Sequence, residues 1–273
     1  MLKENFLKEM IAEDIGRGDL FARVSKGRQI SAYIVAKSSG VFAGREYIDV
    51  LARMYDIVFA WNLEDGDHFE KGEKLVTMRG NSKILLSLER SMLDVMLHTS
   101  SIATLTAAYV DAIKGTGVKL LDTRKTRPLL RELEKYAVRC GGGLNHRMGL
   151  DDCLMLKDTH LKTIDNLPVF MEEVRKKIPF TAKVEIECED LSMAQRAMAA
   201  GADIIMCDNM TLQETSEVVR YRDAHYPHIL IEASGNVTLD TIVAIANTGV
   251  DAISSGSIIH QANWIDLSMR VDG

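Results

Sequence analysis

The hydrophobic positions of the chain follow two different rhythms, one in roughly the first hundred residues and another from residue 118 onward. In the first part, short stretches with helical spacing mix with stretches that alternate between apolar and polar residues. Three glycines, Gly66, Gly72 and Gly80, separate the later pieces. The expected elements are helices over 2–11 and 46–55, a turn over 41–44, and strands over 30–36 and 73–78. This mixture predicts a small α+β domain.

A long helix is predicted over residues 83–113. Leu86, Arg90, Leu93 and Leu97 recur at steps of four, three and four, which puts Arg90 inside an apolar stripe. A charge on a buried face needs a partner, because an unpaired buried charge is costly. Arg90 therefore forms a salt bridge inside the fold, or it is offered to a ligand or across an oligomer interface. The spacing alone does not separate these interpretations.

From residue 118 the pattern becomes strand, loop and helix, repeated. Such repeats predict a parallel sheet with helices outside it. They are too few for a closed eight-fold barrel, so an open, incomplete α/β barrel fits better. The expected strands are 118–121, 153–156, 182–187, 203–207, 229–231 and 251–254, and the expected helices are 128–138, 169–177, 192–200, 212–222 and 239–247. We expect an N-terminal domain over 1–103, the barrel over 104–260, and a tail over 261–273 that packs on the N-terminal domain.

Charged or small polar residues follow every one of these strands. A single residue of this kind is usually a solvated loop residue or a helix cap. The C-terminal ends of parallel strands form one edge, where active sites of α/β folds lie, so six such ends in register favour an active site. The residues are Asp122, Thr123, Arg124, Lys125, Lys157, Asp158, His160, Glu187, Asp208, Asn209, Glu232, Ser234, Gly235, Ser255, Gly256 and Ser257.

The early strand ends carry cations. Residues 124–162 contain nine Lys or Arg against five Asp or Glu, in a chain whose net charge is -6. Arginine binds carboxylates and phosphates in a bidentate way and lysine acts as a point charge, so this region suits a small polyanion. The run Gly141-Gly142-Gly143 precedes His146 and Arg147. It lets backbone N–H groups approach an anion, or it is a plain flexible turn.

The middle and late strand ends carry different chemistry. Glu187 and Asp208 are expected on adjacent strand ends, where paired carboxylates near phosphates suggest Mg²⁺. Alternatively, each carboxylate simply pairs with a nearby cation such as Lys157 or Arg124. The late segments Ser234-Gly235-Asn236 and Ser255-Gly256-Ser257 precede helices. Backbone N–H groups at helix starts bind phosphate, and the last two loops of α/β barrels commonly do so.

Composition excludes several classes. The net charge of -6 disfavours nucleic-acid binding, and no apolar run is long enough for a membrane span. The N-terminal segment MLKENFLKEMIAEDIG mixes acids and bases, so it does not predict a secretory signal. The cysteines, Cys140, Cys153, Cys188 and Cys207, form no CxxC pair. Reduced thiols in a cytoplasmic protein are therefore favoured over zinc ligands or disulfides.

Seven segments resemble the quinolinate phosphoribosyltransferases, also called carboxylating nicotinate-nucleotide pyrophosphorylases. They are EDIGRGD, LERSMLDVMLHTSSIATLT, LDTRKTRPLLRELEKYAVRCGGGLNHRMGLDDCLMLKDTHL, VEIECED, GADIIMCDNM, EASGN and GVDAISSGSIIH. They occur in the family's order over nearly the whole chain. The resemblance implies an N-terminal α/β sandwich followed by an open α/β barrel. It also implies transfer of phosphoribosyl from phosphoribosyl pyrophosphate to quinolinate with decarboxylation, which gives nicotinate mononucleotide, pyrophosphate and CO₂ in NAD biosynthesis.

The resemblance also implies roles for individual residues. The implied catalytic residues are Lys125, Lys157, Glu187 and Asp208, of which Glu187 and Asp208 are expected beside the ribose and Mg²⁺. Substrate binding falls to Arg90, Arg124, Lys125, His146, Arg147, Lys157, Ser234, Gly235, Asn236, Ser255, Gly256 and Ser257. Of these, Arg90 is expected to cross to the neighbouring site of a homodimer, which in this family can form larger assemblies. The chain departs from the family's usual residues at Ser101, Thr159, Asn236 and Ser255.

Two rival hypotheses remain at this point. One is a paralogous enzyme of the same fold with another substrate, such as the relative associated with molybdate-transport operons. The other is a non-catalytic ligand sensor that keeps the anion pocket. Glu187, Asp208 and both phosphate loops disfavour the sensor, because binding a diacid alone does not require them.

Overall fold

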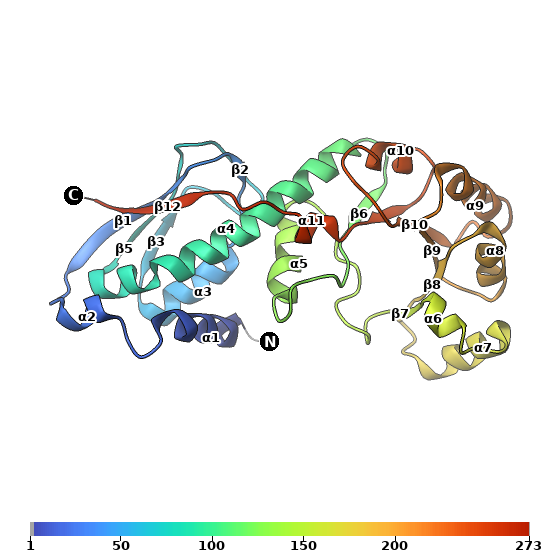
Figure 1. The fold of residues 1–273 in the computed structure, drawn as a ribbon, viewed down its shortest axis with the longest axis horizontal. Helices are drawn as coiled ribbons and strands as arrows, with labels where there is room; N and C mark the ends of the chain where they lie inside the picture. The colour runs from blue at the N-terminus through green and yellow to red at the C-terminus, as the bar shows by residue number, and fades with distance from the viewer. Residues whose placement is uncertain (1–2, 273) are drawn as a thin grey trace. The chain divides into compact units, whose positions relative to one another are not determined.

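The computed structural model describes residues 3–272, and these residues divide into two compact units (Figure 1). Unit 1 contains the chain up to Ala107, the segment Glu132–Gly142 and the residues from Gln261 onward. Unit 2 contains Ala108–Arg131 and Gly143–His260. Among the described residues, no helix has both the length and the hydropathy that crossing a membrane requires.

Unit 1 is built on a four-stranded antiparallel sheet with the order β12-β1-β5-β3. The alternation of β1 buries Ala32, Ile34 and Ala36 against a core that also receives side chains from four helices. The strands are β1 (Gln29–Ala36), β3 (Val58–Trp61), β5 (Lys74–Asn81) and β12 (Leu267–Val271), with a separate pair β2 (Gly40–Val41) and β4 (His68–Phe69). The helices are α1 (Lys3–Ile15), α2 (Leu20–Val24), α3 (Arg45–Tyr55), α4 (Ser82–Ala112) and α5 (Arg131–Cys140).

The long helix α4 forms as predicted, but the placement of Arg90 on a buried stripe is wrong. Its side chain is 61% exposed, and Nη1 lies 3.3 Å from Oδ1 of Asp94 one turn along the same helix. At its start α4 buries only the face that carries Leu85, Leu88 and Met92. From residue 91 to 103 nearly every position is buried, so Leu93 and Leu97 are covered although they lie on the same side of the helix as the exposed Arg90.

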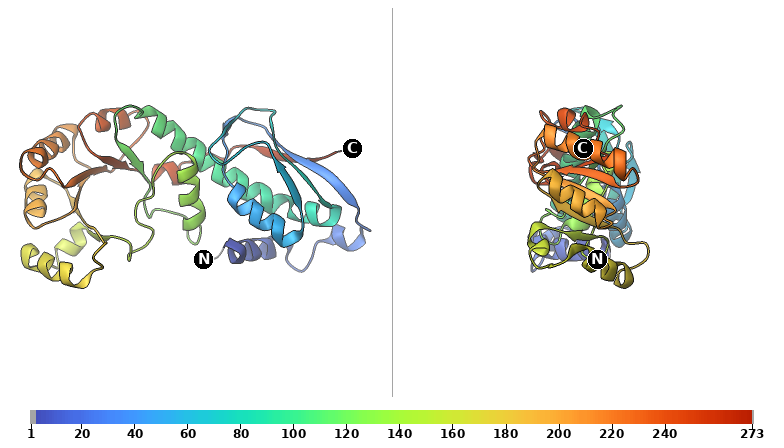
Figure 2. Two further views of the ribbon diagram at one scale, coloured as in Figure 1. Left: turned by 180° about the vertical axis from the view of Figure 1, so that it is seen from behind. Right: turned by 90° about the vertical axis from the view of Figure 1, so that its right-hand side faces the viewer.

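Unit 2 is built on a six-stranded sheet with the order β6-β11-β10-β9-β8-β7, and every pairing in it is parallel. The sheet is curved, and helices α8, α9 and α10 lie along its outer side (Figure 2). The strands are β6 (Lys119–Leu121), β7 (Leu154–Leu156), β8 (Val184–Cys188), β9 (Ile204–Asp208), β10 (Leu230–Ser234) and β11 (Ala252–Ser254). The helices are α6 (Asp158–Leu161), α7 (Leu167–Lys177), α8 (Leu191–Ala199), α9 (Leu212–His225), α10 (Ile242–Ala246) and α11 (Ser257–His260). The predicted α/β class, an α+β domain followed by an open α/β barrel, is confirmed.

A short extended segment lies beside the edge strand β6. Leu144 forms a parallel bridge with Leu121, its N–H donates to the carbonyl of Leu120, and its carbonyl accepts from the N–H of Asp122. From this bridge the chain continues through Asn145, His146 and Arg147 toward β7 on the other edge of the sheet. These three residues matter for the site.

Candidate active site

A cavity of about 560 Å³ opens at the C-terminal ends of the unit 2 strands. This volume lies in the range of small-molecule sites. Strand ends from the whole sheet contribute to it, as expected for parallel strands whose C-terminal ends share one edge. Its lining consists of Asp122, Thr123, Arg124, Lys125, His146, Arg147, Met155, Lys157, Glu187, Met206, Asp208, Asn209, Ser234, Gly235, Asn236 and Ser254.

Two guanidinium groups lie near each other on the cationic side of the cavity. Burial and the positive charge of Arg124 both lower the pKa of Arg147. Nη1 of Arg147 donates to the carbonyl of Cys153 at 3.0 Å, and neither arginine forms an ion pair with a described residue. Nε of Arg124 is buried and makes no hydrogen bond within residues 3–272. Two neighbouring guanidiniums without an acid between them form a receptor for carboxylate groups.

An acidic pair lies on the neighbouring strands β8 and β9. Nζ of Lys157 lies 2.6 Å from Oε2 of Glu187, so one of the alternatives raised by the sequence, pairing with Lys157, occurs here. The lysine side chain is 44% exposed and the glutamate 12%. Asp208 ends β9, and its Oδ2 accepts a hydrogen bond of 3.0 Å from Nδ2 of Asn209.

The strand end after β10 forms a tight turn against the strand end after β9. Gly235 has φ of +95°, and a Cβ there would lie 2.1 Å from Oδ1 of Asn209. Asn209 and Asn236 also have positive φ, +54° and +51°, which asparagine tolerates better than most residues. Nδ2 of Asn236 donates to Oδ1 of Asn209 at 3.0 Å. Asn209 therefore links Asp208 to the Ser234–Asn236 turn.

The second predicted phosphate loop is packed differently. The hydroxyls of Ser255 and Ser257 are buried and hydrogen-bonded to each other, and that of Ser257 also donates to the carbonyl of Val237. Gly256 packs against Lys125, since a Cβ there would lie 3.2 Å from its Cδ. These three residues do not line the cavity, and their role toward phosphate stays a prediction.

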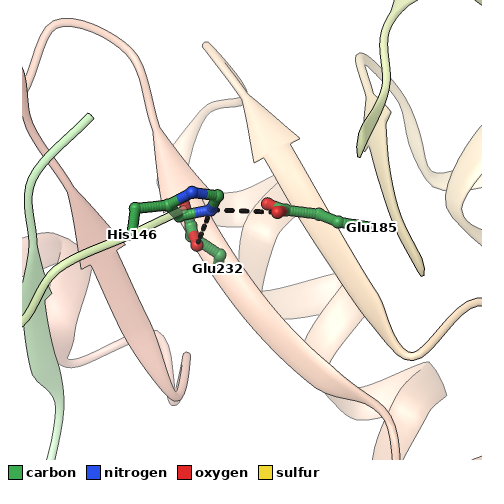
Figure 3. Close-up of side chains that lie close together, drawn as sticks. All are labelled: His146, Glu185 and Glu232. Atoms are coloured by element: carbon green, nitrogen blue, oxygen red, sulfur yellow. Dashed lines mark ion pairs between the residues drawn. The ribbon is translucent and has the colours of Figure 1, made fainter. Parts of the chain in front are cut away.

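Buried acids hold the loop that carries His146 and Arg147. Asp122 accepts from the N–H of His146 at 2.9 Å and from Nδ2 of Asn145 at 2.6 Å. Nε2 of His146 lies 2.9 Å from Glu185 and 3.4 Å from Glu232 (Figure 3). Burial alone would lower the pKa of His146, but hydrogen bonds and attraction from both glutamates raise it to about 10.

Most of the site residues expected from the sequence thus line one cavity. Those that do are Arg124, Lys125, His146, Arg147, Lys157, Glu187, Asp208, Ser234, Gly235 and Asn236. Arg90 belongs to the other unit. Sequence reasoning placed Asp122, Thr123 and Asn209 at the strand ends without giving them a role, and it did not name Met155, Met206 and Ser254. For Ser254, whose buried hydroxyl has no partner among the described residues, its place at a strand end was an available signal.

The chain is similar to known proteins along almost its whole length. Residues 102–270 match the family described as quinolinate phosphoribosyl transferase, C-terminal domain, and residues 19–100 match the corresponding N-terminal domain. A probable nicotinate-nucleotide pyrophosphorylase [carboxylating] from Methanothermobacter thermautotrophicus is 39% identical, covering 98% of this chain and 99% of that protein. The nicotinate-nucleotide pyrophosphorylase [carboxylating] of Mycobacterium leprae is 36% identical over 91% of this chain and 88% of its own. The solved structure of the nicotinate-nucleotide pyrophosphorylase from Francisella tularensis superposes with a TM-score of 0.92 at 33% identity, covering 99% and 96% of the two chains.

Proposed function

This chain belongs to the quinolinate phosphoribosyltransferase family, and we propose that it carries out the family's reaction in the cavity at the strand ends of unit 2. It is a carboxylating nicotinate-nucleotide pyrophosphorylase, which transfers phosphoribosyl from phosphoribosyl pyrophosphate to quinolinate. The products are nicotinate mononucleotide, pyrophosphate and CO₂. The observation that supports this site best is the convergence of a cationic group, an acidic pair and a tight Ser-Gly-Asn turn on one cavity.

Arg124, Arg147 and Lys157 are proposed to bind the two carboxylates of quinolinate, with His146 at the base of the same region. The two arginines are supported by their proximity and by the lack of an internal acid partner. Bidentate binding at two points would fix the pyridine ring in one orientation. Correct orientation of bound reactants is a large part of catalysis for a reaction that joins two substrates.

The ring nitrogen of quinolinate carries its own lone pair, so its attack on the anomeric carbon needs no general base. The C–N bond forms as the bond to pyrophosphate breaks, and positive charge grows on the ribose. Glu187 and Asp208 are proposed to stabilise that positive charge. Lys125 is proposed to lie between the two substrates and to stabilise the negative charge of the groups that meet there. The N-ribosylated ring then accepts the electron pair left at C2 as CO₂ departs, and C2 takes up a proton.

Mg²⁺ is proposed to bind at Glu187 and Asp208. Both are hard carboxylate ligands on neighbouring strands, and each uses one oxygen within the protein, toward Lys157 and Asn209 respectively. The other oxygen of each has no partner among the described residues, so the pair fits a cation that binds few protein ligands and keeps its waters. Bound there, Mg²⁺ would offset the negative charge of the leaving pyrophosphate.

A homodimer with shared active sites is also proposed. Arg90 supports it, because its guanidinium is 61% exposed and lies in unit 1, while the cavity lies wholly in unit 2. An arginine directed outward in this way is available to a second copy of the chain. Symmetric pairing of two copies is the commonest form of protein assembly.

Release of labelled CO₂ tests the proposed function directly. The protein is incubated with quinolinate labelled at the 2-carboxylate, phosphoribosyl pyrophosphate and Mg²⁺, and both CO₂ and pyrophosphate are measured. We expect equimolar release of the two products, loss of both after chelation of Mg²⁺, and no pyrophosphate release when nicotinate replaces quinolinate. Binding of quinolinate without any turnover would instead support a ligand sensor.

A further inference from the structure

A pair of buried glutamates lies beneath the cationic side of the cavity, and the reaction does not call for them. Glu185 comes from β8 and Glu232 from β10, and Nε2 of His146 faces both carboxylates (Figure 3). Their side chains are 0% and 3% exposed. Both carboxylate oxygens of Glu185 and Oε1 of Glu232 make no hydrogen bond within residues 3–272, although one oxygen of each glutamate lies within ion-pair distance of Nε2 of His146. Burial of two carboxylates with incomplete hydrogen bonding is costly, so their presence needs a reason other than stability.

The types of ligand atom would suit a metal ion, but the hydrogen bonding of His146 does not. The N–H of Arg147 donates to Nδ1 of His146 at 2.8 Å, and this bond requires Nδ1 to be without a proton. A histidine that binds a metal through Nε2 carries its proton on Nδ1 and donates it outward. Nε2 of His146 therefore carries the proton here and directs it toward the two carboxylates, which lie 2.9 and 3.4 Å away. The raised pKa of His146, about 10, favours the imidazolium, in which Nδ1 is protonated as well and no longer accepts from Arg147. Nε2 carries its proton in both states, so the link to the acids holds in both.

The acids bind the histidine and leave the arginine next to it unpaired. Arg147 forms no ion pair with a described residue; its Nη1 donates to a backbone carbonyl, and Nη2 lies 3.5 Å from Sδ of Met155. Glu185 nevertheless attracts Arg147 electrostatically and so offsets part of the repulsion from Arg124. The guanidinium thus keeps a compensating charge nearby without losing the donors that a substrate carboxylate would use.

Three buried acids, two within strands and one directly after a third strand, hold this one short segment. Asp122, directly after β6, accepts from Asn145 and from the backbone of His146, while Glu185 and Glu232 bind the histidine ring. The segment has no regular secondary structure of its own, and it runs from the β6 edge toward the β7 edge. Side chains on such loops hold their geometry only when neighbouring groups fix them.

We propose that Glu185 and Glu232 are positioning residues for diacid recognition: by binding Nε2 of His146 they hold the Asn145–Arg147 segment so that Arg147 stays beside Arg124. This inference rests on the proposed function, because it takes the two arginines as the receptor for quinolinate. Its consequence is selective. Loss of the acids weakens binding of the diacid and leaves binding of phosphoribosyl pyrophosphate, at the turn after β10, nearly unchanged.

Quinolinate affinity of the double variant Glu185→Gln/Glu232→Gln tests the proposal. Calorimetry with the full chain and quinolinate alone gives Kd, and steady-state kinetics give KM for each substrate. We expect the double variant to bind quinolinate at least tenfold more weakly, equivalent to about 1.4 kcal/mol, with the KM for phosphoribosyl pyrophosphate changed less than about twofold. Glu134→Gln is the matched control, because Glu134 is another fully buried glutamate, 3.1 Å from Nε2 of His98 in unit 1. We expect that variant to keep the parent's KM for quinolinate.

A quinolinate Kd within twofold of the parent in the double variant overturns the inference. Should the double variant fail to fold, the parent protein itself supplies the test: long-range ¹H–¹⁵N spectra of histidine-labelled protein, assigned with His146→Asn, report which ring nitrogen is protonated. A proton on Nε2 is expected, and an unprotonated Nε2 refutes the link to the acids. Failure of the proposed function itself gives a different result, because the parent chain would then neither bind nor convert quinolinate.

Discussion

Replacement of Gly235 by alanine perturbs the Ser234–Asn236 turn in a way that the structure makes quantitative. The added Cβ would lie 2.1 Å from Oδ1 and 2.5 Å from Cγ of Asn209, while real Cβ atoms essentially never approach other heavy atoms closer than 3.0 Å. The turn or the asparagine must therefore move by about 1 Å. A displacement of that size at a reacting site can reduce turnover on the order of 100-fold.

Neither way of relieving this contact preserves the site. Rotation of Asn209 breaks its hydrogen bonds to Asp208 and Asn236, and movement of the turn shifts the backbone that is expected to bind the 5'-phosphate. We therefore expect Gly235→Ala to raise the KM for phosphoribosyl pyrophosphate at least tenfold. Quinolinate binding, at the cationic side of the cavity, should remain close to that of the parent.

The matched control is Gly201→Ala. Gly201 also has a positive φ, +86° against +95° for Gly235, but a Cβ there meets nothing within 4 Å. Both variants therefore carry the backbone cost of placing alanine in the left-handed region, about 1–2 kcal/mol, and only Gly235→Ala carries the contact. Thermal unfolding measures the first effect and initial rates measure the second. The reasoning is refuted if the two variants have the same KM for phosphoribosyl pyrophosphate.

Three further predictions concern other parts of the chain. Arg124→Ala and Lys157→Ala should each raise the KM for quinolinate by roughly 10- to 100-fold, because each removes a charge-assisted contact to a carboxylate. The unfolding temperature should change little. Near-normal turnover at low quinolinate would contradict these roles. If Arg90 acts in the site of a partner copy, a 1:1 mixture of Arg90→Ala and Lys157→Ala should regain about a quarter of the parent activity after subunit exchange, at a quinolinate concentration so low that each variant alone is nearly inactive. A mixture that stays nearly inactive would speak against shared sites. Burial raises the pKa of the Cys207 thiol to about 12 and also raises the pKa of the Cys188 thiol. At pH 8 neither thiol should therefore form enough thiolate to react with a thiol reagent until the protein unfolds. Fast labelling of either cysteine in the native protein would contradict this prediction.

The sequence was most informative where one physical rule acts over a short distance. The six strands of unit 2 are short apolar runs because parallel strands are covered on both faces, and each was located to within a few residues. The residues that follow these strands were recognised because charged residues come directly after a run of apolar positions. Arg124, Lys157 and Asp208 were found in this way, and they do line one cavity.

Features that depend on distant parts of the chain could not be found in this way. Glu232 is buried in the middle of β10, and nothing in its neighbours shows that it points at a histidine 86 positions earlier in the chain. The strand β12 pairs with β1 across almost the full length of the sequence. Arg90 was placed wrongly because a spacing rule treats α4 as uniform, while its surroundings change from one covered face to burial on all sides.

The partners of the charged groups in the cavity suggest how its work is divided. His146 faces two buried acids, so it serves the internal structure of the site. Arg124 and Arg147 have no acid partner, so a substrate carboxylate can bind them without displacing anything.

Lys157 differs from both, because it holds Glu187 at 2.6 Å while its side chain remains 44% exposed. If Lys157 is to bind a carboxylate of quinolinate and Glu187 a cation, the two must separate, and each gains a new partner of opposite charge when both substrates are present. The exchange costs less when both new partners arrive than when only one does, because either one alone leaves a charge unpaired. The geometry therefore ties the diacid side of the cavity to the phosphoribosyl side through a single ion pair.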